Sequence, residues 1–156
     1  MGAKGYCEVE FSGNLRKTGG VVNVALKSML FMGRIEAEAE KPRANWAVIS
    51  ITEWGAGLAQ LREGWGAVLQ QEFHDIDEKK PDEPYVLFSE AQAQEIVRFV
   101  NMAEDKGLVG VLVHCKAGIS RSAAVAKWIA GRYGLFFPEN YGLYNKHVFK
   151  LLARIE

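Results

Sequence analysis

Residues 111–122 read VLVHCKAGISRS, and this stretch decides how the rest of the chain is interpreted. The apolar run at 108–113 has the composition of a buried strand, and the Ala-rich segment at 121–131 has that of a helix packed on several sides. A short loop with a glycine at position 118 joins them. A buried strand, a tight loop and a helix in this order are typical of α/β proteins.

The composition is that of one globular domain. The chain has 156 residues, 49% of them hydrophobic and 24% charged, and its 19 basic residues balance 19 acidic ones. This mixture excludes a disordered, collagen-like or coiled-coil chain. Without a basic surplus, broad binding to nucleic acid or to acidic membranes is disfavoured. We expect a single domain over residues 1–156, with no nucleic-acid and no membrane partner.

The two cysteines, Cys7 and Cys115, cannot form a disulfide scaffold, and neither belongs to a CxxC pair of the kind that binds zinc. The first ten residues lack the apolar run of a signal peptide, and no stretch approaches the ~18 apolar residues of a membrane span. We therefore expect a cytoplasmic protein with no metal and no cofactor. Cys7 is interpreted as structural, with pairing to an oxidised Cys115 as the alternative.

Apolar and amphipathic segments alternate along the remaining chain, which also favours an α/β fold. Ser89 and Gln92 form a capping box, and Ile96, Phe99 and Val100 follow on one helical face. We predict strands at 6–11, 30–32, 46–51, 66–73 and 108–113, a turn at 12–20, a helical turn at 58–63, and helices at 34–41, from Ser89, at 121–131 and around 148–155.

The loop after residue 113 has the chemistry of a seat for a tetrahedral oxyanion. Successive backbone N–H groups of a strand-to-helix loop can point into one concavity, and a helix N-terminus adds positive partial charge. Gly118 gives the loop freedom to turn, and the planar guanidinium of Arg121 can bind two oxygens. Cys115 lies at the bottom of this seat, where the same charges favour its thiolate, a nucleophile for phosphorus.

His114 and Cys115, followed by five residues and then by Arg121 and Ser122, resemble the HCx5RS signature of the cysteine-dependent protein tyrosine phosphatases. The short chain is most similar to their dual-specificity branch. The resemblance covers about residues 46–155 and leaves residues 1–45 as an unmatched N-terminal segment. It implies a protein tyrosine phosphatase-like fold, with a central, mostly parallel sheet flanked by helices, and hydrolysis of a phosphomonoester through a phosphocysteine.

The resemblance also implies roles for individual residues. Cys115 is the nucleophile, Ser122 hydrogen-bonds its sulfur or only satisfies the first helical turn, and His114 orients the loop. Lys116 adds positive potential or is an ordinary exposed lysine. The implied phosphate-binding residues are Lys116, Ala117, Gly118, Ile119, Ser120 and Arg121.

The reaction needs a proton donor for the leaving oxygen. The resemblance places this acid on a loop that follows a strand upstream of the phosphate loop. Asp75, directly after the strand predicted at 66–73, is favoured, Asp77 is the alternative, and Asp82 lies deeper in the Pro-containing loop. Both carboxylates could instead only solvate an acidic loop. His74 either hydrogen-bonds the acid or is an ordinary loop histidine.

We expect a protein tyrosine or dual-specificity phosphatase, with a phosphorylated protein as its partner and phosphate or another oxyanion in its site. Trp54, after the strand at 46–51, belongs either to the core or to the rim where family substrates bind. The CKAG sequence at 115–118 resembles the loop of phosphatases that act on phosphoinositides or on phosphoserine-containing proteins. A non-protein ester, such as an inositol lipid, a nucleotide or an RNA 5′ end, is therefore an alternative substrate. A phosphate-binding module without turnover is a further alternative.

Overall fold

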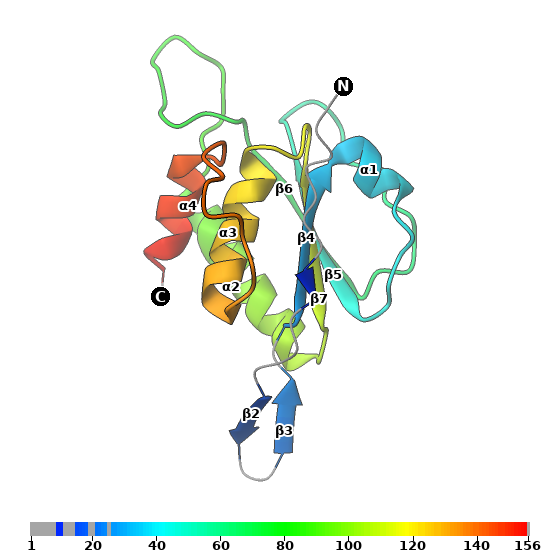
Figure 1. Cartoon of the computed structure of the whole chain (residues 1–156). Helices are drawn as coiled ribbons and strands as arrows, with labels where there is room; N and C mark the ends of the chain where they lie inside the picture. Colours follow the sequence, from blue (N-terminus) through cyan, green and yellow to red (C-terminus); the bar gives the residue numbers. More distant parts are fainter. Residues whose placement is uncertain (1–8, 11–14, 19–20, 25, 156) are drawn as a thin grey trace.

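The computed structural model describes residues 9–10, 15–18, 21–24 and 26–155, and side chains from residue 26 onward (Figure 1). Cys7 and most of the strand predicted at 6–11 lie outside the described residues. Everything that follows refers to the described part of the chain.

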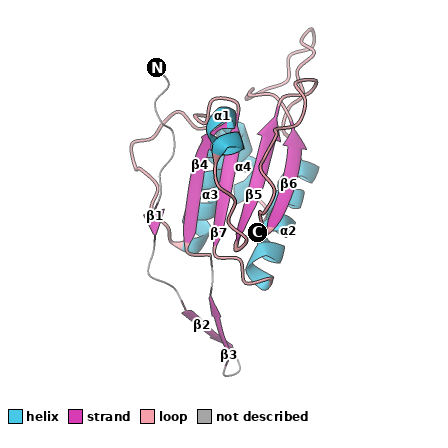
Figure 2. Cartoon of the chain, turned by 90° about the vertical axis from the view of Figure 1, so that its right-hand side faces the viewer, coloured by secondary structure: helices cyan, strands magenta, loops and turns pink. Residues whose placement is uncertain are grey.

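A five-stranded sheet forms the centre of the protein, in the order β1-β4-β7-β5-β6 (Figure 2). Four neighbouring strands run parallel, and β1 pairs antiparallel with β4 at one edge. A separate antiparallel pair, β2 and β3, projects from one end of the body (Figure 1). The strands are β1 (Val9–Glu10), β2 (Leu15–Thr18), β3 (Val21–Val24), β4 (Ser28–Gly33), β5 (Trp46–Thr52), β6 (Ala67–Glu72) and β7 (Gly110–Cys115). The chain therefore has the predicted α/β fold with a central, mostly parallel sheet.

Helices cover both faces of the sheet. The long helices α2 (Glu90–Asp105) and α3 (Arg121–Tyr133) lie with α4 (Lys146–Ala153) on one face, and the short α1 (Arg34–Ala39) lies on the other (Figure 1). Helix α2 begins at Ser89 with both hydrogen bonds of the predicted capping box. None of the helices in the described residues is long and apolar enough to span a bilayer.

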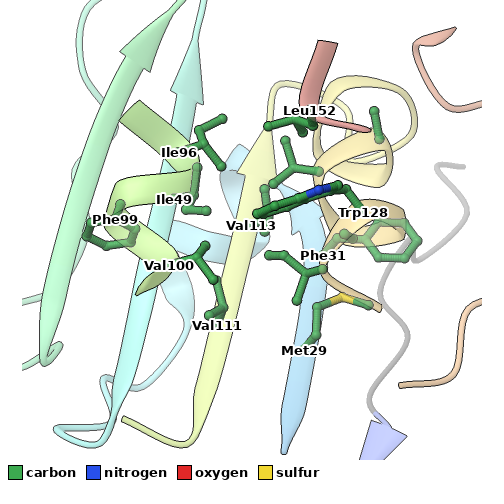
Figure 3. Packing of buried hydrophobic residues seen from close by; sticks show 14 of the residues in the cluster. Met29, Phe31, Ile49, Ile96, Phe99, Val100, Val111, Val113, Trp128 and Leu152 are labelled. Carbon is green, nitrogen blue, oxygen red and sulfur yellow. The ribbon is translucent and has the colours of Figure 1, made fainter. Parts of the chain in front are cut away.

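The central strands β5 and β7 are buried along their whole length, which is why their sequences read as continuous apolar runs. Because side chains alternate along a strand, Val111, Val113 and Cys115 share the main core under α2, α3 and α4, whereas Leu112 belongs to the smaller core on the α1 side. Figure 3 shows Val113 packed with Trp128 and other apolar side chains of the main core.

Two predicted segments differ from the structure. Residues 58–63 form no helical turn, because the carbonyls of Gly57 and Leu58 accept hydrogen bonds from the Arg34 guanidinium at 3.1 and 2.9 Å instead of bonding within a helix. Part of the turn predicted at 12–20 is strand β2, which pairs with β3. Residues 28–33, within the segment that the family resemblance leaves unmatched, form β4, an internal strand of the sheet.

Gly118 lets the loop after β7 touch the end of β4. Its φ is +73°, and an added Cβ would lie 2.3 Å from the Gly33 nitrogen and 2.4 Å from the Met32 carbonyl carbon. We expect Gly118→Ala to destabilise the protein by about 3 kcal/mol, since the new methyl meets backbone that cannot move aside.

Gly131→Ala is the matched control, because this glycine lies in α3 and an added Cβ there meets no atom within 4 Å. This variant should gain about 1 kcal/mol from helix propensity. Urea unfolding of the two variants measures the contrast, and equal effects would show that the contact between the loop and β4 does not constrain the fold.

Candidate active site

The loop of residues 116–120 lies at the carboxyl end of β7, between this central strand and α3 (Figure 1). Crevices at the carboxyl ends of parallel strands are where open α/β sheets bind ligands. The loop is fixed to β4 by Gly118 and by a hydrogen bond from the Arg34 backbone N–H to the Lys116 carbonyl, 3.2 Å long. The fold therefore holds the predicted phosphate loop in one place.

Cys115 ends β7 and is only 2% exposed. Its Sγ is hydrogen-bonded to Oγ of Ser122 at 3.1 Å. Ser122 is fully buried in the first turn of α3, so its hydroxyl has no solvent to bind in place of the sulfur. When the sulfur is a thiolate, the Ser122 hydroxyl is placed to donate to it.

Arg121 is a charged residue that is only 3% exposed. Its Nη1 donates to the Phe73 carbonyl at 2.8 Å, and its Nη2 lies 3.5 Å from the Glu53 carboxylate. Its Nε is buried and has no hydrogen-bond partner among the described residues. A buried donor without a partner costs about 1–3 kcal/mol, so an anion placed against Nε would be stabilised there.

Asp75 is brought directly to the phosphate loop. Its Oδ1 accepts hydrogen bonds from Oγ of Ser120 at 2.8 Å and from Nδ2 of Asn145 at 2.9 Å. Asp77 and Asp82 are exposed, and neither makes a hydrogen bond to a residue that the structure describes. Of the three candidate acids, Asp75 alone is thus hydrogen-bonded to the loop.

His114 lies on the opposite face of β7 from Cys115, because neighbouring residues of a strand alternate. It is fully buried, its Nε2 lies 2.6 Å from Oγ of Ser50 in β5, and its Nδ1 lies 3.5 Å from the Cys115 carbonyl. Burial lowers the pKa of His114 to about 4, and the charges of Arg34 and Arg121 act in the same direction. His114 is therefore neutral at physiological pH and holds the end of β7 rather than facing the loop cavity.

The other loop residues differ in their surroundings. Lys116 and Ala117 are exposed, whereas Ile119 is half-buried and its carbonyl accepts a hydrogen bond from the Tyr141 hydroxyl. Burial raises the pKa of Tyr141, with the charge of Cys115 acting in the same direction. Within the described residues, no group of three or more His, Cys, Asp or Glu side chains is placed to hold a metal ion.

The structure decides between the predicted roles of His74 and excludes one of the two predicted for Trp54. Nδ1 of His74 accepts from the Val86 backbone N–H at 2.8 Å, so the ring closes the base of the following loop and does not bind Asp75. Trp54 is 66% exposed in the turn after β5, so the core interpretation is wrong for this residue. Its position is compatible with the rim.

The structure adds polar residues that sequence reasoning missed. Ser50 is the only polar residue in the apolar run 46–51, and buried polar groups need partners. The need for a hydrogen-bond partner could have been predicted for Ser50 from the sequence, but the identity of that partner, His114, could not. Asn145 precedes an amphipathic segment and could have been recognised as a helix cap. Its contact with Asp75, like that of Glu53 with Arg121, joins residues too far apart in sequence for any local pattern.

A larger groove, with a volume of about 830 Å³, lies between α3 and α4 and is lined by residues that include Trp128, Phe137 and Phe149. It contains none of the predicted site residues. A small cleft of about 130 Å³ lies beside the phosphate loop and is lined by Arg34, Thr52, Lys116 and their neighbours. The candidate site is therefore identified by its chemistry and not by the size of a cavity.

No protein-family model matches the sequence, and neither does any curated protein. Among solved structures, the chain is similar to a human protein described as tyrosine phosphatase-like serine/threonine/tyrosine-interacting protein. The two sequences are 18% identical, the match covers 80% of this chain and 77% of that one, and the TM-score is 0.49. This likeness concerns the arrangement of the chain and leaves the activity to be argued from the site.

The buried neutral state of His114 predicts how stability depends on pH. The pKa of His114 is lowered in the folded protein, whereas an exposed histidine titrates near 6.5, so below 6.5 the unfolded chain binds the proton more readily. The stability that the protein keeps with a neutral His114 is fully present above pH 6.5 and is lost as the pH falls towards 4. We expect the free energy of unfolding to fall by about 2 kcal/mol between pH 7 and 5 from this group.

Urea unfolding at several pH values measures this dependence. His114→Asn is the matched variant, because it removes the titration and keeps a side chain that can bond Ser50. Its stability is expected to be lower at pH 7 but flatter between pH 7 and 5. An unchanged slope in His114→Asn would assign the pH dependence to other groups.

Proposed function

We propose that the protein is a phosphomonoester hydrolase that works through a phosphocysteine, of the protein tyrosine or dual-specificity type. The observation that carries this proposal is the buried, unpartnered Nε of Arg121, which is the neighbour in sequence of the Ser122 that hydrogen-bonds Cys115. A fixed donor and a sulfur nucleophile at the two ends of the loop, with a carboxyl group hydrogen-bonded to it from the 75–85 loop, are the parts that phosphoryl transfer to a cysteine requires.

In the first step the Cys115 thiolate attacks phosphorus, forming the S–P bond as the P–O bond to the leaving group breaks. The backbone N–H groups of the loop and the Arg121 guanidinium hold the remaining phosphate oxygens and their charge. Asp75 gives its proton to the leaving oxygen, so that the product departs as a neutral alcohol or phenol.

In the second step water attacks the phosphocysteine. Asp75, now a carboxylate, takes a proton from this water, and the S–P bond breaks to release phosphate and the thiolate. The Ser122 hydroxyl stabilises the sulfur as it leaves, from its position 3.1 Å away. Asp75 is exposed, so it can also exchange protons with solvent between turnovers.

Phosphorylated proteins are the proposed substrates, on the resemblance of the HCx5RS motif. The exposed Trp54 after β5 supports a rim that contacts the substrate beyond its phosphate. A second candidate, a non-protein phosphate ester, is favoured by the exposed Lys116 and by the cleft that it lines with Arg34 beside the loop. Lys116 adds positive charge near the loop, which suits a substrate that carries further negative charge, whereas the Arg34 guanidinium is already paired with Glu38.

Hydrolysis of 4-nitrophenyl phosphate in the presence of a chelator tests the proposal. Cys115→Ser should abolish turnover and keep vanadate binding, because the anion seat remains. Asp75→Asn should lower kcat about 10²-fold, because Asp75 acts both as the acid of the first step and as the base that activates water in the second. Asp77→Asn is the matched control for the acid and should stay within about twofold of the parent protein, since Asp77 does not bond the loop.

The opposite outcomes are equally informative. Turnover by Cys115→Ser at the parent rate would rule out the phosphocysteine. If the folded parent protein binds vanadate but hydrolyses neither aryl phosphates, phosphopeptides nor phosphoinositides, the loop is a phosphate-binding module and the enzyme proposal fails. A larger loss in Asp77→Asn than in Asp75→Asn would move the acid to Asp77.

A further inference from the structure

Asn145 connects three separate parts of the site. It is 3% exposed and caps α4, with its Oδ1 accepting from the Val148 backbone N–H at 3.0 Å. Its Nδ2 donates to Oδ1 of Asp75 at 2.9 Å and to the Ile76 carbonyl at 3.2 Å. Its own backbone N–H donates to the Ser120 carbonyl at 3.1 Å.

The orientation of this amide follows from its partners. The Val148 N–H can only donate, so the atom of Asn145 facing it must be the oxygen. The nitrogen then necessarily faces Asp75 and the Ile76 carbonyl, which are acceptors. A serine, threonine or aspartate would cap the helix equally well. Of these capping residues, only asparagine also presents a two-proton donor to the acid segment.

The acid segment has few other connections to the body of the protein. The loop of residues 75–85 projects outward (Figure 1), and its other hydrogen bonds lie within the segment, as between Lys79 and Tyr85, or close its base, as between His74 and Val86. Among the described residues, Ser120 and Asn145 supply the hydrogen bonds that join this loop to the rest of the molecule.

We propose that Asn145 is a positioning residue that holds the Asp75 carboxyl group over the phosphate loop and selects the oxygen that transfers the proton. Both donors, from Asn145 and Ser120, bind Oδ1. Oδ2 receives no hydrogen bond from a described residue, so it is the oxygen that carries the proton to the leaving group. This inference rests on the proposed function and adds to it the means by which the acid is aimed.

Asn145→Ser tests the proposal, because serine keeps a cap for α4 and removes the amide donor. The kcat/KM should fall about tenfold for phenyl phosphate, whose leaving group needs the proton, and only about twofold for 4-nitrophenyl phosphate. The inhibition constant of inorganic phosphate should not change, since the anion seat is intact. Asn140→Ser, at an exposed asparagine of the preceding turn, is the matched control.

A double-mutant cycle separates positioning from general damage. In the Asp75→Asn background, Asn145→Ser should have little further effect on kcat/KM for phenyl phosphate, because the side chain at position 75 no longer donates an acid proton. Equal losses for both substrates, or losses that add to those of Asp75→Asn, would reduce Asn145 to a helix cap and overturn the proposal.

Amide hydrogen exchange tests the same contact without any turnover. The Ile76 N–H donates to the His74 carbonyl at 3.0 Å, so its protection reports the order of the acid segment. In Asn145→Ser this amide should exchange about tenfold faster, while amides late in α4 stay protected. Unchanged exchange at Ile76 would overturn the proposal. If the Ile76 amide exchanges faster in Asn145→Ser but the parent protein hydrolyses no phosphate ester, the contact between Asn145 and the acid segment is supported and only the proposed function is refuted.

Discussion

The buried guanidinium of Arg121 is the constraint on which the rest of the site depends. A charge that is only 3% exposed is costly unless its protons are bound, and the protein binds them with the Phe73 carbonyl and the Glu53 carboxylate. These partners lie at the ends of β6 and β5, so fixing the guanidinium also fixes both strand ends around the phosphate loop. Nε has no hydrogen-bond partner among the described residues, so in the proposed reaction it is the guanidinium donor left for a phosphate oxygen.

The alternation of side chains along β7 explains how neighbouring residues take different tasks. Cys115 faces α3, where the Ser122 hydroxyl meets its sulfur, and His114 faces the α1 side, where Ser50 of β5 meets its ring. The pairing is possible because Ser50 and His114 are partners in the parallel register of β5 and β7. A histidine kept neutral by burial adds no second charge behind the loop, so its contribution is to hold the strand end that carries Cys115, the proposed nucleophile.

Local patterns in the sequence were sufficient for the central parallel strands and for the long helices α2 and α3. The run 111–122 and the Ser89–Gln92 box carry their structural meaning within a few residues, and the structure has the predicted elements there. The contacts that complete the site have no such local signal. Asn145 and Asp75 are 70 positions apart, and Ser50 and His114 are 64 apart, so each pair exists only once the strand register and the helix packing are set. The irregular segment after Trp54 was missed for the same reason, since Arg34 of a distant element binds its carbonyls.

Contacts between residues distant in sequence also distinguish Asp75 from Asp77 as the proposed acid. Asp75 and Asp77 are equivalent by composition and nearly so by position, and both are exposed. They differ because the start of α4 and the end of the phosphate loop reach Asp75 from two sides, through Asn145 and Ser120. Two fixed donors on one oxygen restrict the carboxyl group to one orientation. This lowers the entropic cost of orienting the acid for proton transfer. In the proposed reaction the Asp75 carboxyl group is therefore oriented by contacts within the fold itself, through Asn145 and Ser120.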